Sequence, residues 1–438
     1  MLLSMNRTIH HHKVSGTINV PSSKSQTIRA LLIATMAEGT SRITNPLRSQ
    51  DTLSCLSACR SFGAKIEETE SGWLLTGIGN SLKDRDVSEP LIIDTGNSGT
   101  TLYLGAGLAA SLGVPVIFTG DEQIRNRPVA PLLRAFEDLG AKVSYDIAET
   151  YGLAPSLQPG CPPFMIEGPL KGGKTSIECP TSQYLSSLLL ATPLAESESV
   201  IEVPLLNERP YVEMTQAWLV EQDISFSSDS EDTFTISPNQ SYHPYERAVS
   251  GDFSSASFFF CAAAITGSEL TLTGLDPHDT QGDKDILHCL EEMGCIIRWK
   301  KDSVTISGPP AGLKGDISLD LNPIPDTLPI LAVTACFTDG EVRLENVPQA
   351  RIKETDRIAV MCSELKKVGA LIEELPDGLI IHGQKSLSGG TVTGHGDHRV
   401  IMACAIAALA CEDSITIEGT DAVDITCPGF FTLLESIL

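Results

Sequence analysis

Helix-like and strand-like patterns of apolar residues alternate along this chain in the same order six times. In each copy, a run of small and apolar residues leads through a turn into a short strand rich in β-branched residues. The paired helix and strand segments are 30–37 with 41–44, 102–110 with 115–118, 184–191 with 199–203, 256–265 with 269–272, 328–337 with 341–344, and 400–410 with 414–417. Apolar residues lie on nearly all sides of each helix, which predicts that the six helices are buried.

A second helical stretch follows most of these strands and ends in a Gly-Ala-like turn before two further strands. The four clearest turns lie at 62–66, 139–143, 293–297 and 368–372. Successive copies are about 70 to 85 residues apart, which is too long for a stacked solenoid. One copy alone is small for a stable core, so we expect several to pack together. We predict an α/β chain of mixed sheets, divided three copies and three within the polar stretch 237–250.

The first turn of each buried helix is polar. The six turns are 23–26, 96–100, 180–183, 251–255, 325–327 and 396–399. Capping of the first backbone N–H groups explains their Ser, Thr and Asp residues, but it does not require the Lys, Arg, His, Gln and Asn that several also carry. If the helices of one domain run parallel, their starts share one face, and two opposed faces would enclose an anion-binding cleft.

Two further polar clusters lie outside the helix starts, at 120–128 and 351–357. If the second cluster is helical, Lys353 and Arg357 share one face with Glu354 beside them. Such a pair of cations can bind a phosphate or carboxylate, and Glu354 beside them can act as a proton donor. A row of ion pairs on the surface is the alternative interpretation.

The composition narrows the kinds of ligand. The chain has 31 Lys and Arg against 56 Asp and Glu, a net charge of -25, which argues against nucleic acid or an anionic membrane as a partner. Anionic ligands must then be captured by local positive groups. No apolar run approaches the roughly 18 residues that span a bilayer. The 12 cysteines never form Cys-x-x-Cys, and we expect reduced thiols in a cytoplasmic protein.

The run His10-His11-His12 is a candidate metal ligand set. Its polar residues alternate into Val14, Ile18 and Val20, as in a strand with one exposed face. We therefore predict a surface strand here and no metal site.

Taken together, the polar clusters resemble the motifs of the 5-enolpyruvylshikimate-3-phosphate synthase family in their expected order, from Pro21 to Phe431. The matching segments are Lys24-Ser25 with Arg29, 96–100, Arg127-Pro128, 181–183, 251–252 with 254–257, 281–283, 325–326, 353–357 and 397–399. The resemblance implies an α/β fold, a two-domain inverse α/β barrel with three βαβαββ repeats per domain around buried helices. It implies a C-terminal domain of residues 1–21 plus 251–438, an N-terminal domain of residues 22–250, and an active site in the cleft between them.

The reaction implied by the resemblance transfers the enolpyruvyl group of phosphoenolpyruvate to the 5-hydroxyl of shikimate 3-phosphate by addition and elimination. By similarity, Asp326 accepts the hydroxyl proton, Glu354 protonates the methylene carbon, and Lys24 touches both substrates. Shikimate 3-phosphate would bind Lys24, Ser25, Arg29, Thr181, Ser182, Gln183, Arg209, Asp326 and Lys353. Phosphoenolpyruvate would bind Lys24, Asn97, Gly99, Arg127, Gln183, Arg357 and Arg399. Lys353 beside Glu354 should lower the pKa of that carboxyl, whereas an acid at neutral pH needs it raised.

The chain departs from the best-known bacterial pattern of this family at four places. Thr101-Leu102-Tyr103-Leu104 replaces a Met-Arg-Pro segment, Glu208-Arg209-Pro210-Tyr211 replaces Ser-x-Pro-Tyr, Ile425 stands near the place of a Lys, and Gln349 replaces an Asn. At the second place we expect Arg209 to supply the missing contact. The departures resemble the divergent second class of the family. That class implies no required cofactor and leaves activation by a monovalent cation open. Because Gly99 has no side chain to crowd the phosphoenolpyruvate pocket, we expect inhibition by glyphosate, although Leu104 replaces the usual Pro.

Two other functions remain open from the sequence. The sister transferase that uses UDP-N-acetylglucosamine carries a Cys in the loop that matches 120–128, and no Cys occurs there. A non-catalytic anion-binding scaffold is the other alternative, but it would gain nothing from carboxylates such as Asp326 and Glu354 inside its site. We expect small-molecule substrates, no nucleic acid or membrane partner, and a monomer.

Overall fold

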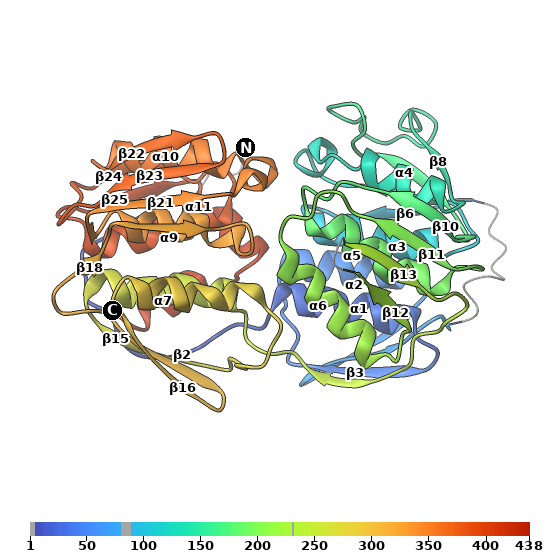
Figure 1. The fold of residues 1–438 in the computed structure, drawn as a ribbon, viewed down its shortest axis with the longest axis horizontal. Helices are drawn as coiled ribbons and strands as arrows, with labels where there is room; N and C mark the ends of the chain where they lie inside the picture. Colours follow the sequence, from blue (N-terminus) through green and yellow to red (C-terminus); the bar gives the residue numbers. More distant parts are fainter. Residues whose placement is uncertain (1–4, 80–88, 230–231) are drawn as a thin grey trace. The chain divides into compact units, whose positions relative to one another are not determined.

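The computed structural model describes residues 5–79, 89–229 and 232–438, which form helices and mixed β-sheets (Figure 1). The chain divides into two compact units, one running from Lys24 to Val249 and the other combining residues up to Ser23 with Ser250–Leu438. We call these the N-terminal and C-terminal units. The change between them falls close to the residues that the sequence suggested, 21–22 and 250–251.

The helices alternate with strands throughout the described residues. The helices are α1 Lys24–Met36, α2 Gln50–Phe62, α3 Gly99–Ala110, α4 Ala130–Asp138, α5 Ser182–Ala191, α6 Arg209–Glu221, α7 Phe253–Thr266, α8 Ile286–Glu292, α9 Leu328–Ala335, α10 Arg357–Lys367, α11 His398–Ala407 and α12 Phe430–Glu435. Each of the six buried segments expected from the sequence overlaps one of α1, α3, α5, α7, α9 and α11, so that prediction is confirmed.

Three four-stranded sheets form the N-terminal unit, in the orders β14-β3-β5-β4, β6-β7-β9-β8 and β10-β11-β13-β12. The strands are β3 Thr40–Thr44, β4 Lys65–Thr69, β5 Gly72–Thr76, β6 Leu91–Asp94, β7 Val116–Thr119, β8 Lys142–Ser144, β9 Phe164–Glu167, β10 Gly173–Ser176, β11 Ser199–Glu202, β12 Phe226–Ser228, β13 Thr233–Ile236 and β14 Glu246–Ala248. In each sheet one parallel pair is extended by two antiparallel strands. The chain order β6-α3-β7-α4-β8-β9 is one complete βαβαββ copy.

The C-terminal unit repeats this plan in two four-stranded sheets, β16-β17-β15-β2 and β19-β21-β23-β22. Its third sheet, β1-β25-β24, has three strands, with one parallel and one antiparallel pair, and a small pair β18-β20 is added. Its strands are β1 Arg7–Ile9, β2 Ser15–Asn19, β15 Glu269–Thr273, β16 Ile296–Lys300, β17 Ser303–Ser307, β18 Leu313–Lys314, β19 Ile317–Asp320, β20 Thr338–Asp339, β21 Glu341–Glu345, β22 Leu371–Leu375, β23 Gly378–His382, β24 Gly390–Thr393 and β25 Ile415–Glu418.

One repeat in each unit takes its first strand from a distant part of the chain. In the C-terminal unit β2 pairs in parallel with β15, so the beginning of the chain completes a sheet whose other strands follow residue 268. In the N-terminal unit β14 pairs in parallel with β3 and closes the first repeat with the last strand before Ser250. The fold is therefore the α/β fold of mixed sheets that the six copies predicted, and it agrees with the two-domain inverse α/β barrel that the resemblance implied.

Each unit has its own apolar core around three of the buried helices. Helix α3 packs against α1 and α5 in one core, while α7, α9 and α11 pack against one another in the other and lie side by side in Figure 1. All 12 cysteines are buried and unpaired. Among the described residues, no helix is long and apolar enough to cross a membrane.

The strand predicted for the histidine run is wrong. His10, His11 and His12 lie in the irregular connection between β1 and β2, and their side chains are exposed. Val14 and Ile18 are nonetheless buried, because the alternation that suggested a strand belongs to β2 and the residue before it. No group of His, Cys, Asp or Glu that could hold a metal ion occurs in the part of the chain that the structure describes.

Gly107 lets α3 pack closely on α5, so a larger residue at this position should lower the stability of the protein. A Cβ added there would lie 2.5 Å from the backbone oxygen of Ser187, so Gly107→Ala must separate the two helices. We expect a loss of about 1–3 kcal/mol in the free energy of unfolding, measured with urea, despite the better helix propensity of Ala.

Gly105→Ala is the matched control in the same buried helix. Its added Cβ would meet only the ring edge of Phe118, at 3.3 Å, and a small ring movement relieves that contact. Equal unfolding free energies for the Gly107→Ala and Gly105→Ala variants would contradict this account of helix packing.

Candidate active site

The starts of α7, α9 and α11 meet in the C-terminal unit. Arg399, in the first turn of α11, donates from Nη1 to Ser254 Oγ of α7 at 2.7 Å and pairs through Nη2 with Asp326 Oδ2 at 2.9 Å, just before α9. The carboxylates of Asp252 and Asp397 cap α7 and α11 by accepting backbone N–H groups. The common face expected for the three helix starts therefore exists within this unit.

Arg357 links three carboxylates at the same place. Its Nη1 lies 2.8 Å from Asp326 Oδ1, its Nη2 lies 2.6 Å from Glu354 Oε2, and its Nε lies 2.8 Å from Asp397 Oδ2. The Arg357 side chain is only 1% exposed. We call Asp326, Glu354, Arg357, Asp397 and Arg399 the C-terminal cluster.

The helical arrangement considered for residues 353–356 does not occur. A 3₁₀ turn ends at Ile352, and α10 begins only at Arg357, capped by the Asp356 carboxylate. Lys353 and Glu354 therefore lie on irregular backbone, which turns the Glu354 carboxylate back onto Arg357.

Charge pairing controls ionisation in the C-terminal cluster. Burial opposes ionisation of Asp326, but Arg399, Lys353 and Arg357 outweigh it and hold the pKa of Asp326 well below its ordinary value. Burial likewise disfavours the charged form of Arg357, yet Asp397, Glu354 and Asp326 raise the pKa of its guanidinium. Asp326 is thus an ionised carboxylate, in the state that a base requires.

The start of α1 presents Lys24 in the N-terminal unit. Lys24 Nζ lies 3.0 Å from Asp51 Oδ2, in the first turn of α2, and the Lys24 side chain is 19% exposed. Thr101 Oγ1 at the start of α3 donates to the backbone oxygen of Asp51 at 3.5 Å. The starts of α1, α2 and α3 therefore meet around Asp51.

Arg127 lies beside the first turn of α3. A Cβ on Gly99 would be 3.9 Å from Arg127 Cζ and 3.9 Å from the Tyr103 ring, which places the guanidinium over this turn. Tyr103 and Tyr184 both donate hydroxyl protons to the backbone oxygen of Pro128, at 3.1 and 2.7 Å. The predicted pair Gly99 and Arg127 is thus brought together.

Asn97, which the sequence predicted to contact phosphoenolpyruvate, lies in the turn just before α3. Asn97 Nδ2 donates to Asp121 Oδ2 at 2.6 Å and to Gln123 Oε1 at 3.1 Å. These bonds tie the turn before α3 to the loop that carries Arg127, so Asn97 has a clear structural role in addition to the predicted one.

The start of α5 carries an unexpected carboxylate. Glu208 Oε2 accepts hydrogen bonds from Ser182 Oγ at 2.7 Å, the Ser182 backbone N–H at 3.1 Å and Thr181 Oγ1 at 3.3 Å. Arg209, which the sequence placed on substrate, pairs instead with Asp232 and is half exposed.

Arg29 is buried among partners from its own unit. It donates from Nε to Thr215 Oγ1 at 2.9 Å, from Nη2 to the Tyr211 backbone oxygen at 3.0 Å, and from Nη1 to the Ser25 backbone oxygen at 3.3 Å. Burial lowers the pKa of Arg29 to about 10. Its Nη2 also donates to Ser186 Oγ of α5 at 3.5 Å, so Arg29 connects α1 to α5 and α6, with the predicted residue Ser25 among its partners.

Sequence reasoning missed three carboxylates at these helix starts, of which Asp51 and Asp397 pair with cations and Glu208 accepts from Thr181 and Ser182. Asp51, Asp397 and Glu208 each lie in or next to a helix start, and Asp397 and Glu208 belong to segments that were noted for other residues. A charged residue at a helix start was a usable signal, but its partner depends on which helix starts meet in space. Lys24 and Asp51, for example, are 27 residues apart.

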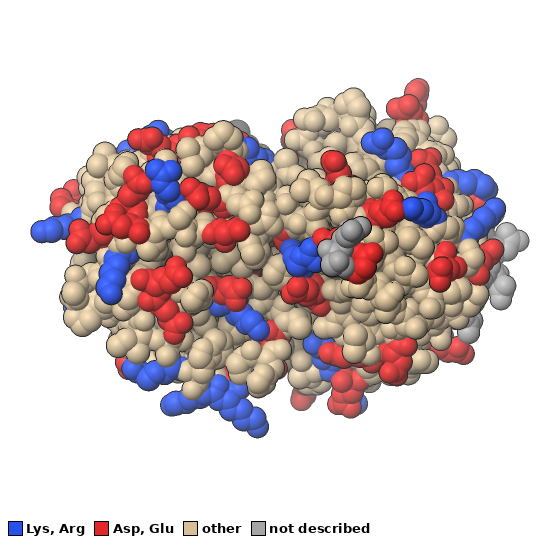
Figure 2. All heavy atoms as spheres, viewed as in Figure 1, with Lys and Arg blue, Asp and Glu red and all other residues tan. Residues whose placement is uncertain are grey.

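Acidic side chains outnumber basic ones in this chain and are spread over its surface (Figure 2). Figure 2 shows Asp and Glu distributed across this face of the molecule with Lys and Arg between them. The C-terminal cluster holds Arg357 and Arg399 among the carboxylates of Asp326, Glu354 and Asp397, so its positive groups act on small anions only at short range.

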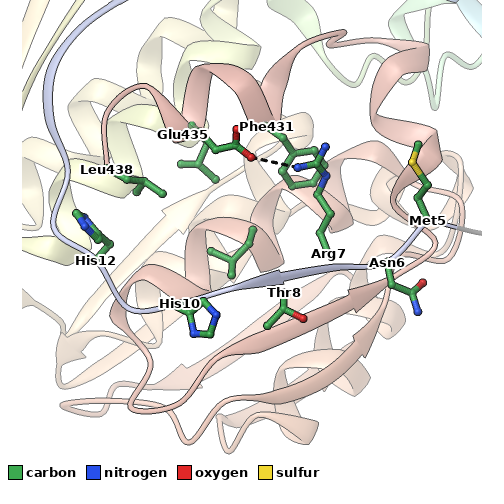
Figure 3. A pocket seen from close by; sticks show the side chains of 11 residues that line it. Met5, Asn6, Arg7, Thr8, His10, His12, Phe431, Glu435 and Leu438 are labelled. Carbon is green, nitrogen blue, oxygen red and sulfur yellow. Dashed lines mark hydrogen bonds and ion pairs between the residues drawn. The ribbon is translucent and has the colours of Figure 1, made fainter.

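A separate cavity of about 620 Å³ lies in the C-terminal unit between β1 and α12. Figure 3 shows Arg7 reaching toward Glu435 across the Phe431 ring at one side of it, with His10, His12 and Leu438 at the other. None of the predicted site residues lines this cavity. It is therefore distinct from the helix starts.

Comparisons with known proteins agree with the geometry. A family model described as EPSP synthase (3-phosphoshikimate 1-carboxyvinyltransferase) matches residues 9–434. A 3-phosphoshikimate 1-carboxyvinyltransferase of Ruminiclostridium cellulolyticum is 47% identical over 97% of this chain and 96% of its own length, and that of Acetivibrio thermocellus is 45% identical over 99% and 98%.

Solved structures give the same result. An EPSP synthase structure from Acinetobacter baumannii superposes with a TM-score of 0.80 at 27% identity, over 99% of this chain and 98% of that one. Together with the six-copy fold and the clustered helix starts, these similarities establish that the chain belongs to the EPSP synthase (3-phosphoshikimate 1-carboxyvinyltransferase) family.

Proposed function

We propose that this chain transfers the enolpyruvyl group of phosphoenolpyruvate to the 5-hydroxyl of shikimate 3-phosphate and releases inorganic phosphate. The reaction is a step of the shikimate pathway, toward chorismate and aromatic amino acids. One observation supports the proposal above the others: an ionised carboxylate, Asp326, and a second carboxylate, Glu354, share the buried cation Arg357. A base and an acid beside anion-binding arginines are what this addition and elimination require.

The addition step forms a C–O bond and a C–H bond. The 5-hydroxyl oxygen attacks C2 of phosphoenolpyruvate while C3 takes a proton. Asp326 accepts the hydroxyl proton and Glu354 supplies the proton to C3. In the elimination step the roles at C3 are reversed. Glu354, now a carboxylate, takes a proton from the methyl group while the C–O bond to phosphate breaks. Lys24 stabilises the departing phosphate, which takes up the proton held by Asp326, so the net change is replacement of phosphate by the 5-hydroxyl oxygen.

Glu354 has to be protonated to begin this sequence. In the structure Arg357 Nη2 lies 2.6 Å from Glu354 Oε2 and favours the carboxylate form. We propose that phosphoenolpyruvate, which carries a carboxylate and a phosphate, binds the guanidinium of Arg357 in place of Glu354. Loss of that cation and exclusion of water then favour the protonated acid, against the opposing effect of Lys353 noted from the sequence.

The remaining predicted contacts divide between the two substrates. Lys24, Ser25, Arg29, Thr181, Ser182, Gln183, Arg209 and Lys353 would bind shikimate 3-phosphate, and Asn97, Gly99, Arg127, Gln183, Arg357 and Arg399 would bind phosphoenolpyruvate. The proposal requires residues of both units to act on the same substrates.

The proposed chemistry is acid-base and electrostatic, so it balances without a metal or an organic cofactor. Activation by a monovalent cation is a further proposal, which rests on the resemblance to the divergent class. Buried, unpaired cysteines support a reducing cytoplasmic location, and we propose a monomer that acts on small molecules.

Release of inorganic phosphate tests the proposed function. Purified chain given shikimate 3-phosphate and phosphoenolpyruvate should release phosphate, and omission of either substrate should stop the release. Release only when UDP-N-acetylglucosamine replaces shikimate 3-phosphate would support the sister transferase. No release with either acceptor would support a non-catalytic anion-binding protein.

Replacement of Lys24 tests its placement on both substrates. We expect Lys24→Ala to lower kcat/KM at least about 30-fold, or about 2 kcal/mol of transition-state stabilisation, because a charge-assisted contact to both substrates is lost. Lys142→Ala is the control, since Lys142 is 77% exposed and pairs with Glu167 outside the site. Thermal unfolding must show that Lys24→Ala is folded, because the change leaves Asp51 without this cation. Near-normal turnover would remove Lys24 from the site.

The low pKa of Asp326 generates a prediction about pH. A lowered pKa keeps the carboxylate ionised at every pH well above its ordinary value of 3.8, so the base is available throughout pH 6 to 8. Asp326→Asn should therefore reduce kcat about 100-fold or more by a similar factor at pH 6, 7 and 8. Asp339→Asn, at an exposed position beyond the other end of α9, is the control. A loss that disappears toward pH 6 would contradict the assignment.

A further inference from the structure

The backbone that follows β11 places Glu208 at the start of α5. The parallel pairing of β10 with β11 continues past both strands, where the Cys179 N–H donates to the Leu205 oxygen at 2.8 Å and the Asn207 N–H donates to the Cys179 oxygen at 3.1 Å. The next residue, Glu208, adopts a left-handed backbone with φ 58° before α6 begins. The pairing therefore fixes where the Glu208 side chain starts.

The left-handed conformation is unfavourable for a residue with a side chain, so Glu208 is an unusual choice for this position. Its side chain is almost fully buried, with 2% of the residue exposed. A buried carboxylate needs strong donors. Here the donors are the Ser182 backbone N–H and the hydroxyls of Ser182 and Thr181.

These donors form the kind of group that binds phosphate. The backbone N–H at the start of a helix carries partial positive charge, and two hydroxyls beside it complete an oxyanion site. Capping does not require the carboxylate, because Thr181 Oγ1 already accepts from the Gln183 backbone N–H. The start of α5 is thus occupied by an internal anion.

A second observation at the same turn indicates a ligand. The side-chain oxygen of Gln183 is buried and has no hydrogen-bond donor among the residues that the structure describes. A buried acceptor without a donor is unfavourable unless something else satisfies it. The hydroxyl groups of a sugar-like acid would do so beside a phosphate held by Thr181 and Ser182.

We propose that Glu208 competes with the phosphate of shikimate 3-phosphate for the donors at the start of α5, and so sets the affinity for that substrate. The inference rests on the proposed function. Two anions cannot share one set of donors at hydrogen-bond distance without strong repulsion. The substrate phosphate therefore binds only when the Glu208 carboxylate has left Thr181 and Ser182.

The competition assigns to Glu208 the role at this segment that the sequence analysis gave to Arg209. At this segment we expected Arg209 to compensate for a missing Ser, but the Arg209 guanidinium pairs with Asp232. Glu208 makes the contacts at Thr181 and Ser182 instead. The charge at position 208, rather than that at 209, controls how strongly phosphate is held.

Calorimetric binding of shikimate 3-phosphate to the full-length chain tests the proposal. Glu208→Gln keeps the size of the side chain and removes its charge, so we expect the dissociation constant to fall about tenfold. Shikimate, which has no phosphate, should bind both proteins equally. Glu213→Gln is the matched control, because Glu213 is exposed on the same helix and loses the same charge; it should leave both affinities unchanged.

The outcomes separate this inference from the function on which it rests. Binding of shikimate 3-phosphate that is unchanged or weaker in a folded Glu208→Gln variant would overturn the competition and make Glu208 a structural support. Failure of the unaltered chain to bind shikimate 3-phosphate would overturn the proposed function and the inference with it. If thermal unfolding shows that Glu208→Gln is not folded, Glu208→Ser is measured by the same criteria, because Ser also removes the charge and retains a hydroxyl.

Discussion

Burial of six apolar helices is the constraint on which the rest of this structure depends. A helix that is apolar on all sides has to be enclosed by sheets and by other helices, and each unit encloses three. Their charged residues lie in the first turns, except for Arg29, which is buried among hydrogen-bond acceptors. In the C-terminal unit the starts of α7, α9 and α11 meet at Arg399 and Asp326, so the polar residues of three repeats form one site. The repetition thus produces a functional surface without any single repeat containing one.

Desolvation at the helix starts then determines how charge is arranged. A buried guanidinium such as Arg357 is stable only when carboxylates or other acceptors surround it. Asp326, Glu354 and Asp397 meet that need for Arg357, Asp51 meets it for Lys24, and Glu208 satisfies the donors of α5. Two of these carboxylates, Glu354 and Glu208, occupy positions that suit an anionic substrate group. Substrate binding in this account is an exchange of internal anions for external ones.

Much of the fold could be predicted from the sequence because its signals are local. The buried helices, their polar starts and the six-fold repetition follow from residue patterns within each copy. The pairing of β2 with β15 depends on contacts between distant segments, and the histidine run was misjudged because its alternation belongs to the neighbouring strand. Lys353 and Glu354 lie on irregular backbone that a helical pattern could not reveal.

The candidate site was predictable in its cations but not in their partners. Arg127, Arg357 and Arg399 were identified individually, whereas Asp51 and Glu208 became relevant only through the arrangement of helices in space.

The most direct measurement of this account is a crystal structure of the chain with shikimate 3-phosphate and phosphoenolpyruvate. The account predicts a substrate phosphate on Thr181 and Ser182, with Glu208 displaced, and phosphoenolpyruvate on Arg357 and Arg399. Substrates bound elsewhere, with Glu208 and Glu354 still on their present partners, would contradict it.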